Sequence, residues 1–498
     1  MSAQLARLII DSDRTISPIS PLLFGGFAEH LGRCIYEGIY EPDSPLADAD
    51  GLRSDVRSAL DELGYTIMRY PGGNFVSGYD WQDGVGPKDK RPARRDLAWM
   101  SVESNQFGTD EFLQFCRKMK TEPMMGLNFG TGDISSAANL VEYCNAPEGT
   151  KWADLRKANG HADPYGVKYW CLGNEMDGSW QIAHLSANDY AKKAREAAKM
   201  MRWMDPSIET FLCGSSGSFM GSFPEWDRTI LEACWDQTNY LSLHHYVTND
   251  ENDTDSFLAK TVVLERHVDV LSATLRYVKE KLRSKKDVYL AWDEWNVWYK
   301  DRTMDGKWQQ APHLLEEIYN LEDALVVAQW MNVFLNKSDV LKVACVAQIV
   351  NVIAPILTRP PNQLVRQTIF YPFMLFRRLA TGLAMDVVVK SPTYSTKLFG
   401  DVPVLHASAS QDAATGRGAV FVVNRSQTES VTVEIEWRAM SPTRVGSIHQ
   451  ISGSDPKAGN SFDNPRQVVP RTFDGGLIQN GKFTLTLPPL SFTALEIV

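Results

Sequence analysis

The sequence predicts an α/β protein in which a (β/α)8 TIM barrel precedes a C-terminal antiparallel β-sandwich of the jelly-roll type. Between about residues 20 and 384, short apolar runs rich in β-prone residues alternate with longer stretches of helical periodicity. After Met385 the pattern changes to short alternating strands separated by turn residues. The 498 residues exceed one ordinary domain, so we expect one large and one smaller domain.

The barrel prediction depends on a count of strand-like runs. There are eight, at residues 20–30, 65–74, 122–130, 167–175, 210–216, 239–246, 287–295 and 340–350. Each parallel connection needs a helix that covers the outer face of the sheet, which the intervening helical stretches supply. A doubly wound open sheet is the alternative, and it predicts a glycine-rich phosphate loop after an early strand. "FGGFAEH" and "YPGGN" lack that spacing, which favours the barrel.

Two helices between these runs have recognisable ends. The first, in "LRSDVRSALDELG", has Leu52, Val56, Leu60 and Leu63 on one face and ends at Gly64, where a left-handed cap is inexpensive. The second follows the fourth run, starts with a capping-box variant at Ser186 and Asp189, and ends before Pro206. Its predicted buried face contains Tyr190, Ala194, Ala197, Met201 and Met204.

The predicted sandwich contains alternating strands such as "GAVFVVN" (418–424), "SVTVEIEW" (430–437) and "GKFTLTLPP" (481–489). "ARLIID" (6–11) alternates in the same way, so we expect it to pair with these strands. The predicted division is therefore an N-terminal strand that joins the sandwich (1–17), the catalytic barrel (18–384) and the C-terminal β-sandwich (385–498).

Composition excludes several classes of function. The formal charge of −10 and the pI near 5.5 leave no basic field for nucleic acid. No apolar run of membrane-spanning length occurs, and the N-terminus lacks the features of a secretory signal, so a cytoplasmic protein is expected. Seven cysteines at irregular spacing include no C-x-x-C pair, which predicts buried thiols and no disulfide framework.

Two glutamates follow apolar strands: Glu175 after "YWCLGN" and Glu294 in "YLAWDEW". The C-terminal ends of barrel strands face a common mouth, so both side chains should point into one site. Two such carboxylates are the minimum for glycoside hydrolysis, in which one protonates the leaving oxygen and the other attacks the anomeric carbon or activates water. The structural alternative is that each glutamate caps a strand or pairs with a nearby arginine.

Side chains near these glutamates suit a sugar. Asn174 can donate to a sugar hydroxyl, and indole faces can cover the C–H faces of a sugar ring. The tryptophans of these segments, which could equally belong to the core, are Trp170, Trp180, Trp292, Trp295 and Trp298.

Neither metal nor serine chemistry is indicated. His244 and His245 are adjacent on a predicted strand and point to opposite faces, so they do not easily bind one ion, and no paired Cys/His spacing accompanies them. "CGSSGS" (213–218) does not match the G-x-S-x-G nucleophile elbow. We therefore expect hydrogen-bonding histidines and no metal site.

Several extended segments carry a family resemblance. "GNEMDGSW" and "DEWNVWY" look like the acid/base and nucleophile motifs of glycoside hydrolase clan A. Six segments carry a narrower resemblance: "FAEHLGRCIYEGIY", "MRYPGGNFVSGYDW", "LAWMSVESNQFGTDEFL", "LGNEMDGSWQ", "HHY" and "AQIVNVIAP". Together they resemble the α-L-arabinofuranosidases of glycoside hydrolase family 51, in clan A, over essentially the whole chain. The resemblance implies that Glu175 is the general acid/base, that Glu294 is the nucleophile, and that Asn174 holds the 2-hydroxyl of the furanose.

The resemblance also implies a wider substrate site. Glu29 and Asn74 would bind hydroxyls of the terminal sugar, and Tyr246 would lie beside the nucleophile. Gln348 would close the pocket from the eighth strand. Arg69 would keep the nucleophile ionised unless it forms a plain structural ion pair. Trp99 and Trp298 would line the cleft unless they pack in the core.

The function that follows is an exo-acting, retaining α-L-arabinofuranosidase that releases terminal arabinose from arabinoxylan or arabinan oligosaccharides by double displacement. The family resemblance implies no cofactor and a homo-hexamer. Two alternatives stay open: a clan A glycosidase acting on β-D-xylosides or β-glucans, and a carbohydrate-binding protein that does not cleave.

Overall fold

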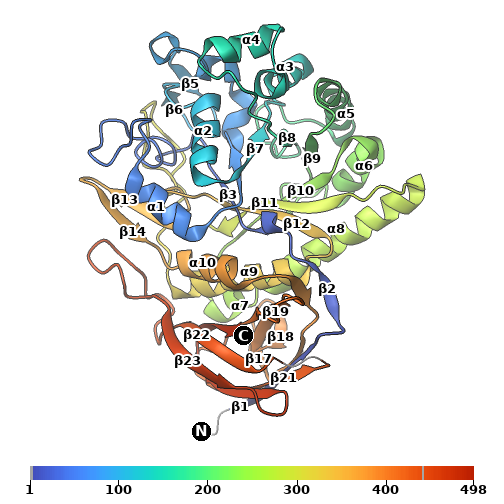
Figure 1. The fold of residues 1–498 in the computed structure, drawn as a ribbon, viewed down its shortest axis with the longest axis vertical. Coiled ribbons are helices and arrows are strands. Elements are labelled where there is room, and N and C mark those ends of the chain that lie inside the picture. The colour runs from blue at the N-terminus through green and yellow to red at the C-terminus, as the bar shows by residue number, and fades with distance from the viewer. Residues whose placement is uncertain (1–3, 440–441) are drawn as a thin grey trace.

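Eight parallel strands close into a barrel in the computed structural model, which describes residues 4–439 and 442–498 (Figure 1). Around the barrel the strands follow chain order, because β12 pairs with β3 and β9 with β10. Each strand lies within one of the predicted runs or extends past its end by at most two residues, which confirms the predicted barrel. The strands are β3 (Gly25–Phe27), β4 (Ile67–Tyr70), β7 (Glu122–Gly126), β8 (Tyr169–Leu172), β9 (Glu209–Leu212), β10 (Tyr240–Val247), β11 (Tyr289–Val297) and β12 (Leu341–Ala347).

Helices surround this barrel in Figure 1 and cover its outer face. The predicted helix that ends at Gly64 is α1, and Gly64 has φ of 67°, a left-handed conformation that a residue with a Cβ adopts less readily. The helices are α1 (Ser54–Leu63), α2 (Thr109–Met119), α3 (Ile134–Asn145), α4 (Lys151–Ala158), α5 (Ala187–Met204), α6 (Glu225–Cys234), α7 (Thr254–Leu258), α8 (Thr261–Leu282), α9 (Leu321–Asn336) and α10 (Phe370–Leu379).

Helix α5 is the second predicted helix, and its buried face matches the prediction except at Met204. Ser186 caps it by accepting a hydrogen bond from the Asp189 N–H. Tyr190 and Met201 are fully buried as predicted, but Met204 is 39% exposed. Met204 is the last residue of the helix, where its side chain is only partly covered.

The C-terminal part forms two facing sheets with a separate apolar core. Strand β1 (Gln4–Asp11) lies in the smaller sheet, parallel to β21 and antiparallel to β16, so the two ends of the chain share one unit (Figure 1). The smaller sheet has the order β16 (Val388–Lys390), β1, β21 (Val431–Arg438) and β24 (Lys482–Leu487). The larger sheet has the order β2 (Thr15–Pro18), β15 (Leu383–Met385), β19 (Leu405–Gln411), β20 (Gly418–Asn424), β25 (Ser491–Ile497), β22 (Arg444–Ser452) and β23 (Arg471–Leu477).

Helices α9 and α10 lie between the barrel and the sandwich (Figure 1). The ring of Phe376 in α10 stacks on Phe421 of β20 and on Phe492 of β25, with centroid distances of 3.9 and 5.5 Å. These rings bury a continuous apolar contact, which joins the sandwich to the barrel as one packed molecule.

Shorter elements lie in the connections. Three two-stranded ribbons pair β5 (Arg94–Asp96) with β6 (Ser101–Glu103), β13 (Ile356–Arg359) with β14 (Gln363–Arg366), and β17 (Thr393–Thr396) with β18 (Gly400–Pro403). The 3-10 helices span Pro21–Leu23, Asn74–Gly78, Trp81–Gly84, Lys88–Lys90 and Trp235–Gln237. The connection from β4 to α2 (71–108) holds three of these helices and the β5–β6 ribbon, and it reaches the mouth of the barrel.

All seven cysteines lie in the described residues and are free and buried, as the spacing predicts. Among residues 4–439 and 442–498, no helix combines the length and the apolar composition that crossing a bilayer requires.

Candidate active site

Glu294 lies near the C-terminal end of β11 and is held by groups from two other strands. Arg69 of β4 donates from Nη1 to its Oε1 at 2.6 Å, and the Tyr246 hydroxyl of β10 donates to its Oε2 at 3.0 Å. Arg69 also donates to Asn174 Oδ1 at 2.6 Å, and its Nε lies 3.3 Å from Asp293 Oδ2. Burial opposes the charge of Arg69, but Asp293 and Glu294 raise its pKa well above the usual value. A permanent cation therefore faces the Glu294 carboxylate.

Glu175 lies just beyond β8, with its backbone in the left-handed region at φ 44°. His244 Nδ1 is 3.0 Å from its Oε1, and the indole N–H of Trp180 donates to its Oε2 at 2.5 Å. Burial and the nearby charge of Glu294 raise the pKa of Glu175, against the lowering effects of His244 and Trp180. Glu175 is thus the carboxyl of the pair that environment favours as a proton donor.

The two carboxyl groups are close enough for covalent catalysis. One oxygen of Glu175, one oxygen of Glu294 and one ring nitrogen of His244 all lie within 4.8 Å of one another. Retaining glycosidases place their carboxyl groups about 5–5.5 Å apart, whereas inverting enzymes need about 6.5–9.5 Å to admit a water molecule. This closeness is well below the inverting range and fits a retaining enzyme.

His244 is the charged bridge between the carboxylates. Its Nδ1 also lies 3.4 Å from Glu294 Oε2, and its Nε2 lies 3.5 Å from Asp293 Oδ1. Burial alone would lower the pKa of His244, but the charge of Glu294 and its contacts with Asp293 and Glu175 raise it to about 10. Although the three converging groups could in geometry hold a metal ion, an imidazolium and the Arg69 guanidinium would repel one.

His245, the next residue, faces away from the site, as alternation along a strand predicts. Its ring packs against His267 and Trp330 at centroid distances of 5.9 and 6.3 Å. Burial lowers the pKa of His245 to about 4 and that of His267 to about 3, so both are neutral core residues at physiological pH.

A third buried carboxyl group of the site belongs to Glu29, which follows β3 and accepts hydrogen bonds from three donors. The Trp99 indole and the Phe75 backbone N–H each donate to Glu29 Oε1 at 3.0 Å, and Gln348 Nε2 donates to Oε2 at 3.1 Å. Burial raises the pKa of Glu29 to about 8, and the charge of Glu294 adds to the effect. A Cβ on Gly73 would lie 2.5 Å from Glu29 Oε2, so only glycine lets the chain pass this close.

Comparisons with known proteins bear on this geometry. Residues 59–262 match the model described as the α-L-arabinofuranosidase 1 domain, and residues 293–491 match the α-L-arabinofuranosidase C-terminal domain. An intracellular exo-α-(1→5)-L-arabinofuranosidase from Bacillus subtilis is 44% identical over 495 residues, covering 99% of each chain. AbfB from Bifidobacterium longum, a family 51 α-L-arabinofuranosidase of known structure, is 38% identical, with a TM-score of 0.96 over 100% of both chains.

The chain belongs to glycoside hydrolase family 51. It is an exo-acting α-L-arabinofuranosidase. A further solved relative is the arabinose complex of the α-L-arabinofuranosidase from Thermotoga maritima, which is 33% identical, with a TM-score of 0.90 over 99% of this chain and 100% of that one.

The residues predicted from the sequence of this arabinofuranosidase gather at the C-terminal ends of the strands. Trp298 packs its ring edge-on against Tyr246 at 5.5 Å, and half-buried Asn74 precedes Phe75 in the turn around Glu29. Of the five tryptophans in the segments around Glu175 and Glu294, Trp180 and Trp298 border the site. The others belong to the core, where they are fully buried: Trp170, Trp292 and Trp295.

The sequence-based site omits His244, which contacts both catalytic carboxyl groups, and Asp293, which contacts Arg69 and His244. Trp180, considered there only as a surface for the sugar ring, donates to Glu175. Strand periodicity offers a signal for His244, because it lies two residues before Tyr246 and therefore on the same face. Asp293 directly precedes Glu294, but its contact with Arg69 depends on the pairing of distant strands.

Proposed function

We propose that Glu294 is the nucleophile and Glu175 the general acid/base of a double displacement at the anomeric carbon of a terminal arabinofuranose. The observation that carries the proposal is the unequal environment of two carboxyl groups within 4.8 Å. Burial and the charge of Glu294 raise the pKa of Glu175, while Arg69 and Tyr246 hold Glu294 with donors at 2.6 and 3.0 Å. One group is thus suited to carry a proton and the other a charge.

In the first step, a Glu294 oxygen attacks the anomeric carbon as the bond to the leaving oxygen breaks. Glu175 gives its proton to that oxygen, so the leaving group departs as an alcohol. In the second step, Glu175 as carboxylate takes a proton from water, whose oxygen attacks the anomeric carbon and displaces Glu294. Two inversions give arabinose of retained configuration.

We infer that eight further residues bind the sugar and keep it in register with the carboxyl groups. Glu29 at the base of the site, with Gln348 and Trp99 on its oxygens, would accept from or donate to sugar hydroxyls according to its protonation. Asn174, held by Arg69, would contact the 2-hydroxyl. The remaining proposed contacts are Arg69, Asn74, Tyr246 and Trp298.

The proposed substrates are arabinan and arabinoxylan oligosaccharides. Several relatives are named exo-α-(1→5)-L-arabinofuranosidases, and one from Bifidobacterium longum, at 43% identity, is named an exo-α-(1→6) enzyme. Relatives named intracellular support a cytoplasmic enzyme that acts on imported oligosaccharides. The proposed reaction needs no cofactor or metal. We also propose that the enzyme assembles as a homo-hexamer. The proposed domains are the N-terminal strand (1–17), the barrel (18–384) and the sandwich (385–498).

A substrate panel tests this proposal. The enzyme should hydrolyse an aryl α-L-arabinofuranoside at least about 100-fold faster, in kcat/KM, than the β-D-xyloside or β-D-glucoside with the same leaving group, because the site must match the furanose transition state. Release of arabinose from (1→5)- and (1→6)-linked oligosaccharides, followed by chromatography, gives the linkage. Faster cleavage of the xyloside or glucoside would contradict the proposed substrate.

The pH profile of a His244→Asn variant tests the electrostatic role of the bridging imidazolium. Loss of this cation should move the basic limb of the kcat/KM profile to higher pH, because the proton is then held more tightly by Glu175. The value at the optimum should fall about 100-fold. His245→Asn is the matched control, since it alters the opposite face of the same strand and should leave the basic limb in place. An unmoved profile in His244→Asn would refute the role.

A further inference from the structure

The β4–α2 connection (71–108), built only of short 3-10 helices and the β5–β6 ribbon, carries Trp99 into the site. Long loops lose much conformational freedom when they are ordered, so an indole on such a loop needs an anchor to stay in place. Hydrogen bonds of Arg91 and Asp96 anchor this connection.

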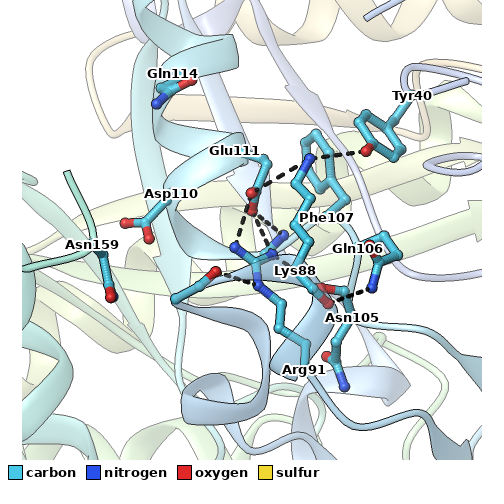
Figure 2. A network of polar contacts seen from close by, with 12 residues as sticks. Tyr40, Lys88, Arg91, Asn105, Gln106, Phe107, Asp110, Glu111, Gln114 and Asn159 are labelled. Atoms are coloured by element: carbon cyan, nitrogen blue, oxygen red, sulfur yellow. Dashed lines mark hydrogen bonds and ion pairs between the residues drawn. The ribbon is translucent and has the colours of Figure 1, made fainter. Parts of the chain in front are cut away.

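Arg91 is the anchor at the base of the loop. Its guanidinium donates from Nη1 and Nη2 to the two carboxylate oxygens of Glu111, each at 2.9 Å. Its Nε donates to the Gly86 carbonyl at 2.9 Å, and its Nη1 also donates to the Asn105 carbonyl at 3.0 Å. Figure 2 shows the guanidinium of Arg91 and the Glu111 carboxylate facing each other, with Lys88 approaching the same carboxylate. The Arg91 side chain thus joins two parts of the loop, at Gly86 and at Asn105, to Glu111 in the first turn of α2.

This pair differs from an ordinary surface ion pair. The Arg91 side chain is only 3% exposed, and Glu111 also accepts the N–H of Gly108 at 2.9 Å. Buried, bidentate arginine–carboxylate pairs define geometry closely, and removal of one partner leaves the other unpaired. Neither residue touches the catalytic carboxyl groups, so any effect on the reaction must pass through the loop.

A continuous set of contacts leads from Arg91 to Trp99. The Asn105 carbonyl is held by Arg91, and the chain before it forms β6, which pairs with β5. Asp96 ends β5 and accepts hydrogen bonds from the Ala98 N–H at 2.9 Å and the Trp99 N–H at 3.2 Å. The Trp99 carbonyl is also bonded by the Gly306 N–H at 3.0 Å. Trp99 therefore lies in the turn that joins β5 to β6, and Arg91 holds the opposite end of this ribbon through the Asn105 carbonyl.

We propose that Arg91, through its forked pair with Glu111, is a positioning residue that sets the affinity of the enzyme for the terminal sugar by holding Trp99 against Glu29. The inference rests on the proposed function, in which Trp99 and Glu29 belong to the sugar site. It assigns a role in binding to a residue outside that site. The chemical step, carried by Glu175 and Glu294 on other strands, stays intact.

The first test is the steady-state kinetics of Arg91→Gln with an aryl α-L-arabinofuranoside. KM should rise about tenfold or more while kcat stays within about twofold. The reason is that the loop no longer holds Trp99 in position, whereas the catalytic carboxyl groups stay in place. Arg94→Gln is the matched control: Arg94 forms a similar fork with Asp83 at 2.8 and 3.1 Å in the same connection, but its side chain is 63% exposed. The control should change neither constant by more than about twofold.

Two further variants keep the test valid if Arg91→Gln does not fold. Arg91→Lys keeps the charge but cannot form the fork, and Glu111→Gln keeps the shape of the acceptor without its charge, so both should raise KM in the same direction. Circular dichroism and thermal unfolding establish that each variant is folded before its kinetics are compared.

A double-mutant cycle with Trp99→Phe decides whether Arg91 acts through the indole. Trp99→Phe removes the hydrogen bond to Glu29 and should itself raise KM. Arg91→Gln should then add less than about twofold in the Trp99→Phe background, since the group that it positions is already lost. A full additive effect, an unchanged KM in Arg91→Gln, or an equal loss in Arg94→Gln would each overturn the inference. If Glu294→Ala is inactive at the same time, the proposed function survives and only the role of Arg91 fails.

Discussion

Glu294→Ala should reduce turnover by roughly five orders of magnitude, even for an aryl α-L-arabinofuranoside with an activated leaving group. Without the carboxylate no glycosyl-enzyme can form, and a better leaving group does not replace a missing nucleophile. Release of the phenol, followed by absorbance, measures the loss. Replacement of the exposed Glu225 of α6 by alanine is the control and should leave turnover unchanged.

Azide then reports the stereochemistry of this variant. The small anion should occupy the cavity left by the Glu294 carboxylate and attack the anomeric carbon directly, giving the arabinosyl azide of inverted configuration. NMR of the product assigns the anomer. An azide product of retained configuration from Glu294→Ala would mean that the nucleophile is still present, and the assigned roles would be exchanged.

Glu175→Ala should show a loss that depends on the leaving group. Substrates with poor leaving groups should slow by about 10²–10⁴-fold, because the departing oxygen no longer receives a proton. An activated aryl group departs almost without help, so the first step should survive and the glycosyl-enzyme should accumulate, since the base that activates water is also lost. A pre-steady-state burst of phenol, together with the mass of the trapped enzyme, measures this accumulation.

Azide should rescue turnover of Glu175→Ala, since it attacks the glycosyl-enzyme without general base catalysis and yields the azide of retained configuration. A uniform loss for good and poor leaving groups, or an inverted azide product, would contradict the acid/base role of Glu175. The raised pKa of Glu175 predicts that the native enzyme loses activity as pH rises through that pKa, and this basic limb should be absent in Glu175→Ala with the activated substrate.

Local pattern was sufficient to predict the architecture of this protein. Eight apolar runs separated by helical stretches specify a barrel, because parallel strands need covering helices and the closed sheet removes every strand edge. The same logic predicted that Glu175 and Glu294 face one mouth, since the C-terminal ends of barrel strands converge. Gly64 and Ser186 marked helix ends through conformational and hydrogen-bonding preferences that act within a few residues.

The family resemblance extended the prediction to residues such as Glu29, Arg69 and Gln348, which local pattern alone does not connect. Their distances follow from closure of the barrel, in which β12 pairs with β3 and β3 with β4. Which tryptophans belong to the core and which border the site could be decided only from the tertiary structure. Trp292 and Trp295 are fully buried, whereas Trp180, in a loop after β8, reaches the Glu175 carboxyl group.

The sequence by itself therefore determined the order of elements and the pair of catalytic candidates, because both depend on interactions between near neighbours and on the periodicity of strands. Only the tertiary structure decided the electrostatics of the site. The charge on His244, the raised pKa of Glu29 and the anchoring of the Trp99 loop by Arg91 arise from burial and from contacts between segments far apart in the chain. Desolvation and Coulomb interaction depend on distances in space, and those distances exist only after the barrel has closed.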